Sequence, residues 1–224
     1  MNEQEYRYWA DYVKEYVPLQ KGALESYENW HNRALLGRLL ANLNIYKPAI
    51  ELLESILEEV KQEDDEQYIW SLSDLADYYW VSTGDKEHSI ELLNLAIDCL
   101  SQKTVTSFPL INRGLLYNQM WQIHALSGDT DKVTQEIYSI IKNEEVHKKE
   151  EKTNSLLFYS YFNLALLAFE KEDTSQAIQL LKQAYTYSEV NLKEVDHILT
   201  LDLSPQGTVS QLLSLTHRHM QFDC

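Results

Sequence analysis

The stretch "STGDKEHSIELLNLAI", residues 82–97, decides the fold, because its pattern occurs three times in the chain. It begins with a Gly-Asp turn and continues with apolar residues three or four positions apart, which is the period of an α-helix. "LSGDTDKVTQEIYSII" (126–141) and "EKEDTSQAIQLLKQAY" (170–185) follow the same pattern. With an earlier turn at 45, the turns fall at 45, 85, 129 and 173, in steps of 40, 44 and 44 residues. The chain is therefore expected to be a repeat of helical hairpins.

Helical spacing continues outside these stretches, and no segment shows a convincing strand pattern. Only 6 Gly and 4 Pro punctuate the 224 residues, which favours long helices joined by short turns. Ser204-Pro205-Gln206-Gly207 is interpreted as a final turn, and no long linker separates two domains. The expected helices cover residues 3–16, 22–43, 47–62, 67–82, 86–101, 109–126, 130–144, 153–171, 174–188, 191–200 and 206–220.

The bulk composition indicates a soluble protein of a reducing cytoplasm. Hydrophobic residues make up 44% and charged residues 24%, and two cysteines, Cys99 and Cys224, are too few for a disulfide framework. The acidic N-terminus does not resemble a secretory signal, and no apolar run approaches the roughly 18 residues of a membrane span. The net charge of −16 argues against nucleic acid as a ligand; its field would attract a basic partner, and the alternative interpretation, which the composition favours, is that the acidity only keeps the protein soluble.

Small and large apolar residues recur at fixed positions in each unit. They are Leu36, Gly37, Ala49, Leu53 and Ile56 in the first unit, Ala76, Trp80, Ser89, Leu93 and Ala96 in the second, Met120, His124, Val133, Ile137 and Ile140 in the third, and Leu164, Ala165, Ala177, Leu181 and Ala184 in the fourth. This pattern resembles the tetratricopeptide repeat (TPR) family, although the period exceeds the usual 34 or so residues of that family. Such stretched repeats are similar to those of peptide-sensing regulators of Gram-positive bacteria, but no helix-turn-helix precedes residue 30.

The resemblance implies an all-α fold, a right-handed superhelix of stacked antiparallel helical hairpins (a TPR-like α-solenoid). Residues 1–29 would form an N-terminal capping helix and the start of the array, 30–188 four TPR-like hairpins, and 189–224 a C-terminal capping hairpin. "LLFYSYFNLALLAF", residues 156–169, is apolar almost all round, which predicts a central helix covered on two sides. His124 falls at a packing position and is predicted to belong to the core.

In the TPR family the first helix of each hairpin lines a concave surface that binds proteins or peptides. Transferred to this chain, the resemblance implies a binding surface made of Arg38, Asn42, Asp74, Tyr78, Asn118, Gln122, Tyr159, Phe162 and Asn163. Asparagine and glutamine donate and accept hydrogen bonds at once, so they suit the backbone of an extended peptide. A solvated inner face without a ligand is the alternative interpretation of the same residues.

No signature of catalysis or metal binding is evident. The sequence has no glycine-rich phosphate loop, no nucleophile elbow, and no His or Cys pair at metal-ligand spacing; His217 and His219, two residues apart, point to different sides of a helix. We therefore expect no catalytic residues, no metal and no cofactor.

The sequence thus favours a non-enzymatic scaffold that binds a protein or peptide through the concave face. One alternative is an acidic inhibitor or immunity protein that neutralises a basic toxin. A second is a peptide-sensing regulator without a DNA-binding domain, and the least favoured is an enzyme with unrecognised carboxylates. Which partner is bound, and the oligomeric state, do not follow from the sequence.

Overall fold

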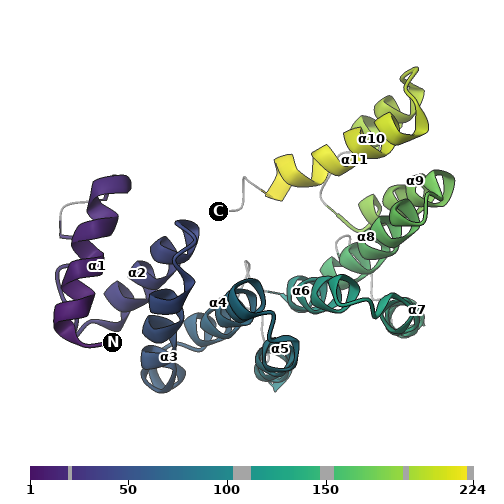
Figure 1. Ribbon diagram of the computed structural model, residues 1–224. Coiled ribbons are helices and arrows are strands. Elements are labelled where there is room, and N and C mark those ends of the chain that lie inside the picture. Colours follow the sequence, from purple (N-terminus) through teal and green to yellow (C-terminus); the bar gives the residue numbers. More distant parts are fainter. Residues whose placement is uncertain (20–21, 103–111, 147–153, 189–191, 221–224) are drawn as a thin grey trace. The chain divides into compact units, whose positions relative to one another are not determined.

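The computed structural model describes residues 1–19, 22–102, 112–146, 154–188 and 192–220, and these form eleven α-helices and no strand (Figure 1). The all-α prediction is confirmed. The helices are α1 (Glu3–Tyr16), α2 (Trp30–Asn42), α3 (Tyr46–Glu63), α4 (Asp65–Thr83), α5 (Lys86–Gln102), α6 (Arg113–Leu126), α7 (Thr130–Val146), α8 (Ser155–Glu170), α9 (Thr174–Tyr185), α10 (Leu192–Thr200) and α11 (Pro205–Met220).

Most helices lie where the sequence predicts them, but the second begins late. The prediction of a helix from residue 22 is wrong, because Gly22 (φ 92°) and Leu24 (φ 65°) adopt left-handed backbone conformations that a helix cannot contain. α2 begins only at Trp30, after Asn29, whose side chain accepts a hydrogen bond from a backbone N–H of the first turn. At the other end of the chain, the expected final turn is instead the start of α11, which Pro205 begins.

Asparagine or aspartate precedes many of the helices and explains where they begin. Each of these side chains accepts a hydrogen bond from a backbone N–H in the first turn, which would otherwise lack an intrahelical partner. The residues are Asn2, Asn29, Asp64, Asn112, Asn154 and Asp173. The Asn2 backbone N–H in turn donates a hydrogen bond to the Glu5 carboxylate, which completes a capping box.

A residue with left-handed backbone ends the first helix of each repeat. These residues are Asn44 (φ 62°), Gly84 (φ 69°), Gly128 (φ 88°) and Glu172 (φ 62°). They are spaced by 40, 44 and 44 residues, the same steps as the turns in the sequence. The predicted repeat is therefore present in the backbone, including the two turns that lack glycine.

The chain divides into two compact units, Met1–Ile111 and Asn112–Cys224. In the first, α1 packs on α2, and α2, α3, α4 and α5 pack each on the next. In the second, α8 is the central helix: it contacts α6, α7 and α9, while α9 contacts α10 and α11. The predicted coverage of 156–169 on two sides is thus confirmed, whereas the division at 29 and 188 stays a prediction.

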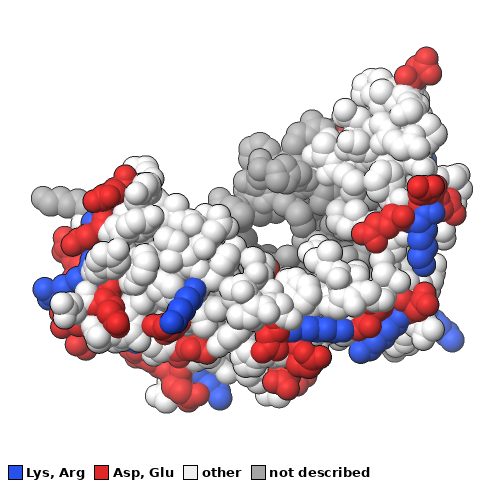
Figure 2. All heavy atoms as spheres, viewed as in Figure 1, with Lys and Arg blue, Asp and Glu red and all other residues white. Residues whose placement is uncertain are grey.

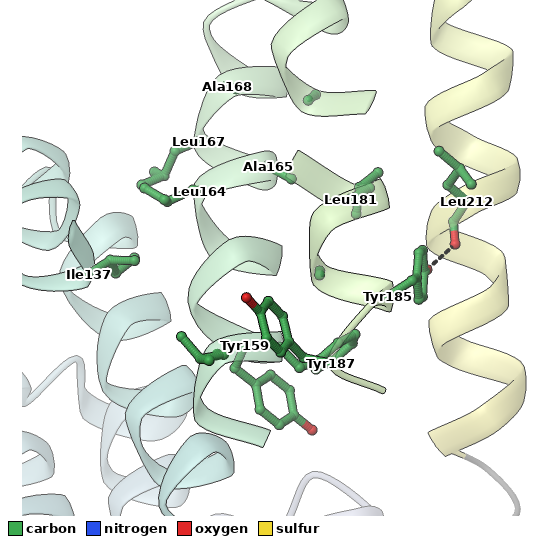
Figure 3. Close-up of a cluster of buried hydrophobic side chains, with 14 of the residues drawn as sticks. Ile137, Tyr159, Leu164, Ala165, Leu167, Ala168, Leu181, Tyr185, Tyr187 and Leu212 are labelled. Carbon is green, nitrogen blue, oxygen red and sulfur yellow. Dashed lines mark hydrogen bonds between the residues drawn. The ribbon is translucent and has the colours of Figure 1, made fainter. Parts of the chain in front are cut away.

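In the core of the second unit, different sides of α8 pack against α7 and α9 (Figure 3). Leu164 and Leu167 point toward Ile137 of α7, and Ala165 lies on the side of α8 that faces Leu181 of α9. The Tyr185 hydroxyl donates a hydrogen bond to the backbone carbonyl of Leu212, which fastens α9 to α11. Leucines on one side and alanines on the other let two neighbours approach α8 at different distances.

Gly37 allows the two helices of the first hairpin, α2 and α3, to pack closely. A Cβ atom at this position would lie 3.3 Å from both the Ala49 carbonyl oxygen and the Leu53 Cγ of α3. The small residue at this point of the repeat therefore permits the close packing of α2 on α3, as the family resemblance implies. His124, predicted to be a core residue, is buried and its Nδ1 lies 3.3 Å from Asp129 Oδ2.

Candidate functional site

All nine residues of the predicted binding surface lie on the first helices of the four hairpins, α2, α4, α6 and α8. In the first unit these are Arg38 and Asn42 of α2 and Asp74 and Tyr78 of α4; in the second they are Asn118 and Gln122 of α6 and Tyr159, Phe162 and Asn163 of α8. Within each unit, some of these residues contact one another.

In the first unit, an ion pair joins α2 to α4. Arg38 Nε donates to Asp74 Oδ2 at 2.7 Å, and Arg38 Nη1 donates to Gln67 Oε1 at 3.1 Å. Burial raises the pKa of Asp74, and the Arg38 guanidinium opposes this effect. The two charges pair with each other, while Arg38 Nη2 is buried with no hydrogen-bond partner among the described residues.

The other two predicted residues of this unit do not join the ion pair. Tyr78 is buried, its ring centroid lies 6.0 Å from that of Tyr46, and burial raises the pKa of its hydroxyl. Asn42 is exposed at the last position of α2. The first unit therefore presents Asn42 to solvent and uses Tyr78 in packing.

In the second unit, three side-chain amides form a network between α6 and α8. Asn163 Nδ2 donates to Asn118 Oδ1 at 2.8 Å and to the Tyr159 backbone carbonyl at 2.8 Å, and Gln122 Nε2 donates to the same Asn118 oxygen at 3.3 Å. Asn163 is only 5% exposed, so its position is fixed. We call Asn118, Gln122 and Asn163 the amide network.

The side chains of Tyr159 and Phe162 belong to an aromatic cluster around Phe158. Both rings lie against Phe158, with centroid separations of 5.1 Å and 5.7 Å. Tyr159 is 8% exposed and Phe162 is partly buried. These two aromatic side chains therefore serve mainly to pack the start and middle of α8.

A pocket of about 190 Å³ adjoins the amide network. Gln122 and Asn163 belong to both, and the remaining lining residues are Trp121, Ala125, Leu126, Val133, Leu166, Leu167 and Glu170, from α6, α7 and α8. The pocket is thus mainly apolar with a few polar groups, the composition typical of a ligand-binding site.

Sequence reasoning did not identify the pocket residues Trp121, Leu126 and Glu170 as functional. Trp121 is fully buried, and Leu126 is 73% exposed although it is apolar. The sequence carries no clear signal for them: Leu126 ends α6 directly before the Ser127-Gly128 turn, and a single exposed leucine is common on protein surfaces.

Many exposed acidic side chains lie on α1 and on the second helices of the first unit. Figure 2 shows them over α1, α3 and α5. Exposed carboxylates on α3 and α5 include Glu54, Glu58, Glu63, Glu87 and Glu91. The second helices of the first unit therefore carry much of the negative charge that this face displays.

Two further properties concern the described part of the chain as a whole. None of its helices combines the length and apolar character needed to cross a membrane. Within it, no three His, Cys, Asp or Glu side chains gather as they would around a metal ion. Cys99 is a free, half-buried thiol whose pKa is raised by burial.

Comparison with known proteins identifies the fold. The sequence matches no protein-family model and no curated protein. Among solved structures, it is similar to the nearly identical TPR-like repeats described as those of a kinesin light chain from Podosopora anserina, with a TM-score of 0.54 and 17% identity over 83% of this chain and 86% of that chain. It is also similar to BtubC (BKLC) from P. vanneervenii, with a TM-score of 0.53 and 15% identity over 99% of this chain and 90% of that chain.

The chain therefore has a TPR-like repeat fold, as the residue pattern predicts. At these identities the likeness concerns the fold alone. What the chain binds has to be argued from its own side chains.

Proposed function

We propose that this protein is a non-enzymatic scaffold that binds a protein or peptide, and that the second unit carries the binding surface. The amide network of Asn118, Gln122 and Asn163, beside a mainly apolar pocket, is the observation that carries the proposal. Amides offer both donors and acceptors to a peptide backbone, and the pocket offers a place for a side chain.

The hydrogen bonds of the network leave capacity for a ligand. Both described bonds of the Asn163 side chain use its Nδ2, and no described donor contacts its Oδ1. The Gln122 side chain is exposed and its Oε1 likewise has no described donor. Two acceptors next to one pocket suit the N–H groups of an extended segment better than they suit an anion.

Affinity capture from the native cell tests the proposal. The N118A/N163A double variant is expected to lose the partner that wild-type protein retains, because Asn118 accepts both amide bonds of the network. N94A, which removes an exposed asparagine of α5, is the matched control and should retain the partner. Equal capture by all three proteins contradicts this location of the binding surface.

A second candidate function is that of a cytoplasmic inhibitor or immunity protein that covers a basic partner. The net charge of −16 and the carboxylates on α3 and α5 favour it. Association with a basic protein would then be steered by the field, and its rate should fall steeply as salt rises. An association rate that does not change with salt contradicts this function, while loss of binding in N118A/N163A favours the first.

A further inference from the structure

The pocket exists because the third hairpin is more open than the others. Counting back seven residues from the left-handed positions Asn44, Gly128 and Glu172 gives Gly37, Trp121 and Ala165; from Gly84, which directly follows the last residue of α4, the same count gives Asp77. The third repeat thus has tryptophan at the position where the first and fourth have glycine and alanine.

A large side chain at this position separates the two helices of the hairpin. α6 contacts α7 much less than the first helix of any other repeat contacts its second helix, and α7 packs more extensively on α8 than on α6. Trp121 is fully buried and lines the pocket together with Val133 of α7, so its large ring fills volume that a glycine or alanine would leave to the neighbouring helix. The opening beside the ring is the pocket.

The size of the pocket fits one apolar side chain. A cavity of about 150 Å³ lined by apolar groups accommodates a benzene molecule; this pocket, at about 190 Å³, matches a leucine or phenylalanine side chain. Trp121, Val133 and Leu167 are buried and form its inner part, whereas Leu126 is mostly exposed at its edge. An occupant would cover Leu126 and remove apolar surface from water.

The edge of the pocket carries one charge, and that charge is negative. Glu170 is exposed at the end of α8, and no basic side chain of the described residues pairs with it. None of the residues that line the pocket is lysine or arginine. A cationic residue beside the apolar side chain would therefore gain an ion pair, and an acidic one would be repelled.

We propose that this pocket binds a leucine- or phenylalanine-sized side chain of a partner protein's extended segment, and that Glu170 pairs with a lysine or arginine next to it in that segment. The proposal rests on the proposed function and specifies the chemistry of its ligand. Asn163 Oδ1, at the same pocket, would accept a hydrogen bond from the backbone of the segment.

The test uses the full chain and the capped peptide Ac-Gly-Lys-Leu-Lys-Gly-NH2, followed by NMR through the indole N–H signal of Trp121, which W121F assigns. Wild-type protein should bind this probe weakly. Replacing the peptide leucine by alanine should weaken binding about tenfold or more, because burial of a leucine side chain is lost. Replacing both peptide lysines by glutamate should also weaken it severalfold.

Variants of the protein locate the effect. A125L fills the pocket and should remove binding, while Q135L adds the same side chain to the exposed surface of α7 and should not. E170Q should abolish the preference for lysine over glutamate in the peptide, and E87Q on α5 should leave it unchanged. Circular dichroism shows whether A125L folds; if it does not, the peptide substitutions and E170Q still decide.

Three results overturn the proposal. One is equal binding of the leucine and alanine peptides; another is an A125L protein that folds and binds as wild type. The third is concentration-dependent self-association that A125L removes, since the pocket then serves a second copy of the chain. If N118A/N163A still loses its cellular partner while A125L keeps it, the proposed function holds and only this inference fails.

Discussion

Two pairs of first helices, α2 with α4 and α6 with α8, are joined by different chemistry. Arg38 and Asp74 join the first pair as an ion pair, and Asn118 and Asn163 join the second through their amides. In the ion pair each charge is the main partner of the other. Each amide carries both a donor and an acceptor, whereas a guanidinium only donates and a carboxylate only accepts, so the amide pair can meet both the N–H and the C=O groups of a peptide backbone. The comparison indicates why the second unit is the better candidate for binding.

The largest predicted effect concerns the third hairpin, which has Trp121 where the first hairpin has Gly37. W121A removes a fully buried ring and should lower the free energy of unfolding by about 3–5 kcal/mol, the usual cost of a large-to-small change in a core. Urea denaturation followed by circular dichroism measures it.

W121F is the control for this change. It keeps most of the ring and removes an indole Nε1 that is buried without a hydrogen-bond partner, so its cost should be clearly smaller. If W121A costs less than about 1 kcal/mol, the third hairpin can close without the ring, and the ring is not what holds it open.

The reverse change in the first hairpin should have the next largest effect. G37L places a large side chain where a Cβ atom alone already meets Ala49 and Leu53 at 3.3 Å. Such overpacking typically costs about 1–3 kcal/mol. G37A should cost less, because its tight contact is offset by the better helix propensity of alanine. A G37L protein as stable as wild type would mean that α2 and α3 separate at no cost.

The local features of this fold were predictable from the sequence. Helical spacing and the turns after the first helices depend on residues within a few positions of each other, and the observed left-handed residues follow the predicted steps. The start of α2 was not predictable in this way, because Ala23, Leu24 and Glu25 are good helix formers and yet Leu24 adopts a left-handed conformation. Tertiary packing, which buries Leu24, overrides its propensity there.

The candidate site was predictable only in part. The family resemblance selected Asn118, Gln122 and Asn163, and the structure brings them together. It also selected Arg38 and Asp74 as separate ligand-binding groups, but these lie 36 residues apart in sequence and pair with each other. The sequence analysis did not single out Trp121, which stands seven residues before the left-handed Gly128 as Ala165 stands before Glu172, so the pocket could not be anticipated.

The two helix pairs can also be compared by removing one partner of each. R38M leaves the partly buried Asp74 carboxylate without its cation and should cost about 1–2 kcal/mol, less than a fully buried pair because both side chains keep some exposure. N118A leaves one amide donor of Asn163 unpaired and should cost about 1 kcal/mol. Urea denaturation of both variants measures the difference. A larger cost for N118A than for R38M would show that the amide pair is the tighter junction.

The smallest predicted effect is a pH dependence of the ion pair. Burial raises the pKa of Asp74 above its ordinary value, and Arg38 only partly offsets this, so the folded state holds the Asp74 proton more tightly than the unfolded state. Stability linked to this proton is present below the ordinary pKa of aspartate and is lost as pH rises through the folded-state pKa. D74N has no such proton and avoids the loss.

We therefore expect D74N to become more stable relative to wild type as pH rises from about 3 to about 7, because only the wild-type protein loses the stability linked to the Asp74 proton. This interval begins below the ordinary pKa of aspartate. Urea denaturation at several pH values measures the gap. D98N, which neutralises an exposed carboxylate of α5, corrects for the general loss of one negative charge from an acidic chain. A gap that moves the other way as pH rises would mean that the attraction of Arg38 outweighs the burial of Asp74. The ion pair would then stabilise the packing of α2 on α4 at neutral pH, as expected from the short 2.7 Å contact between Arg38 Nε and Asp74 Oδ2.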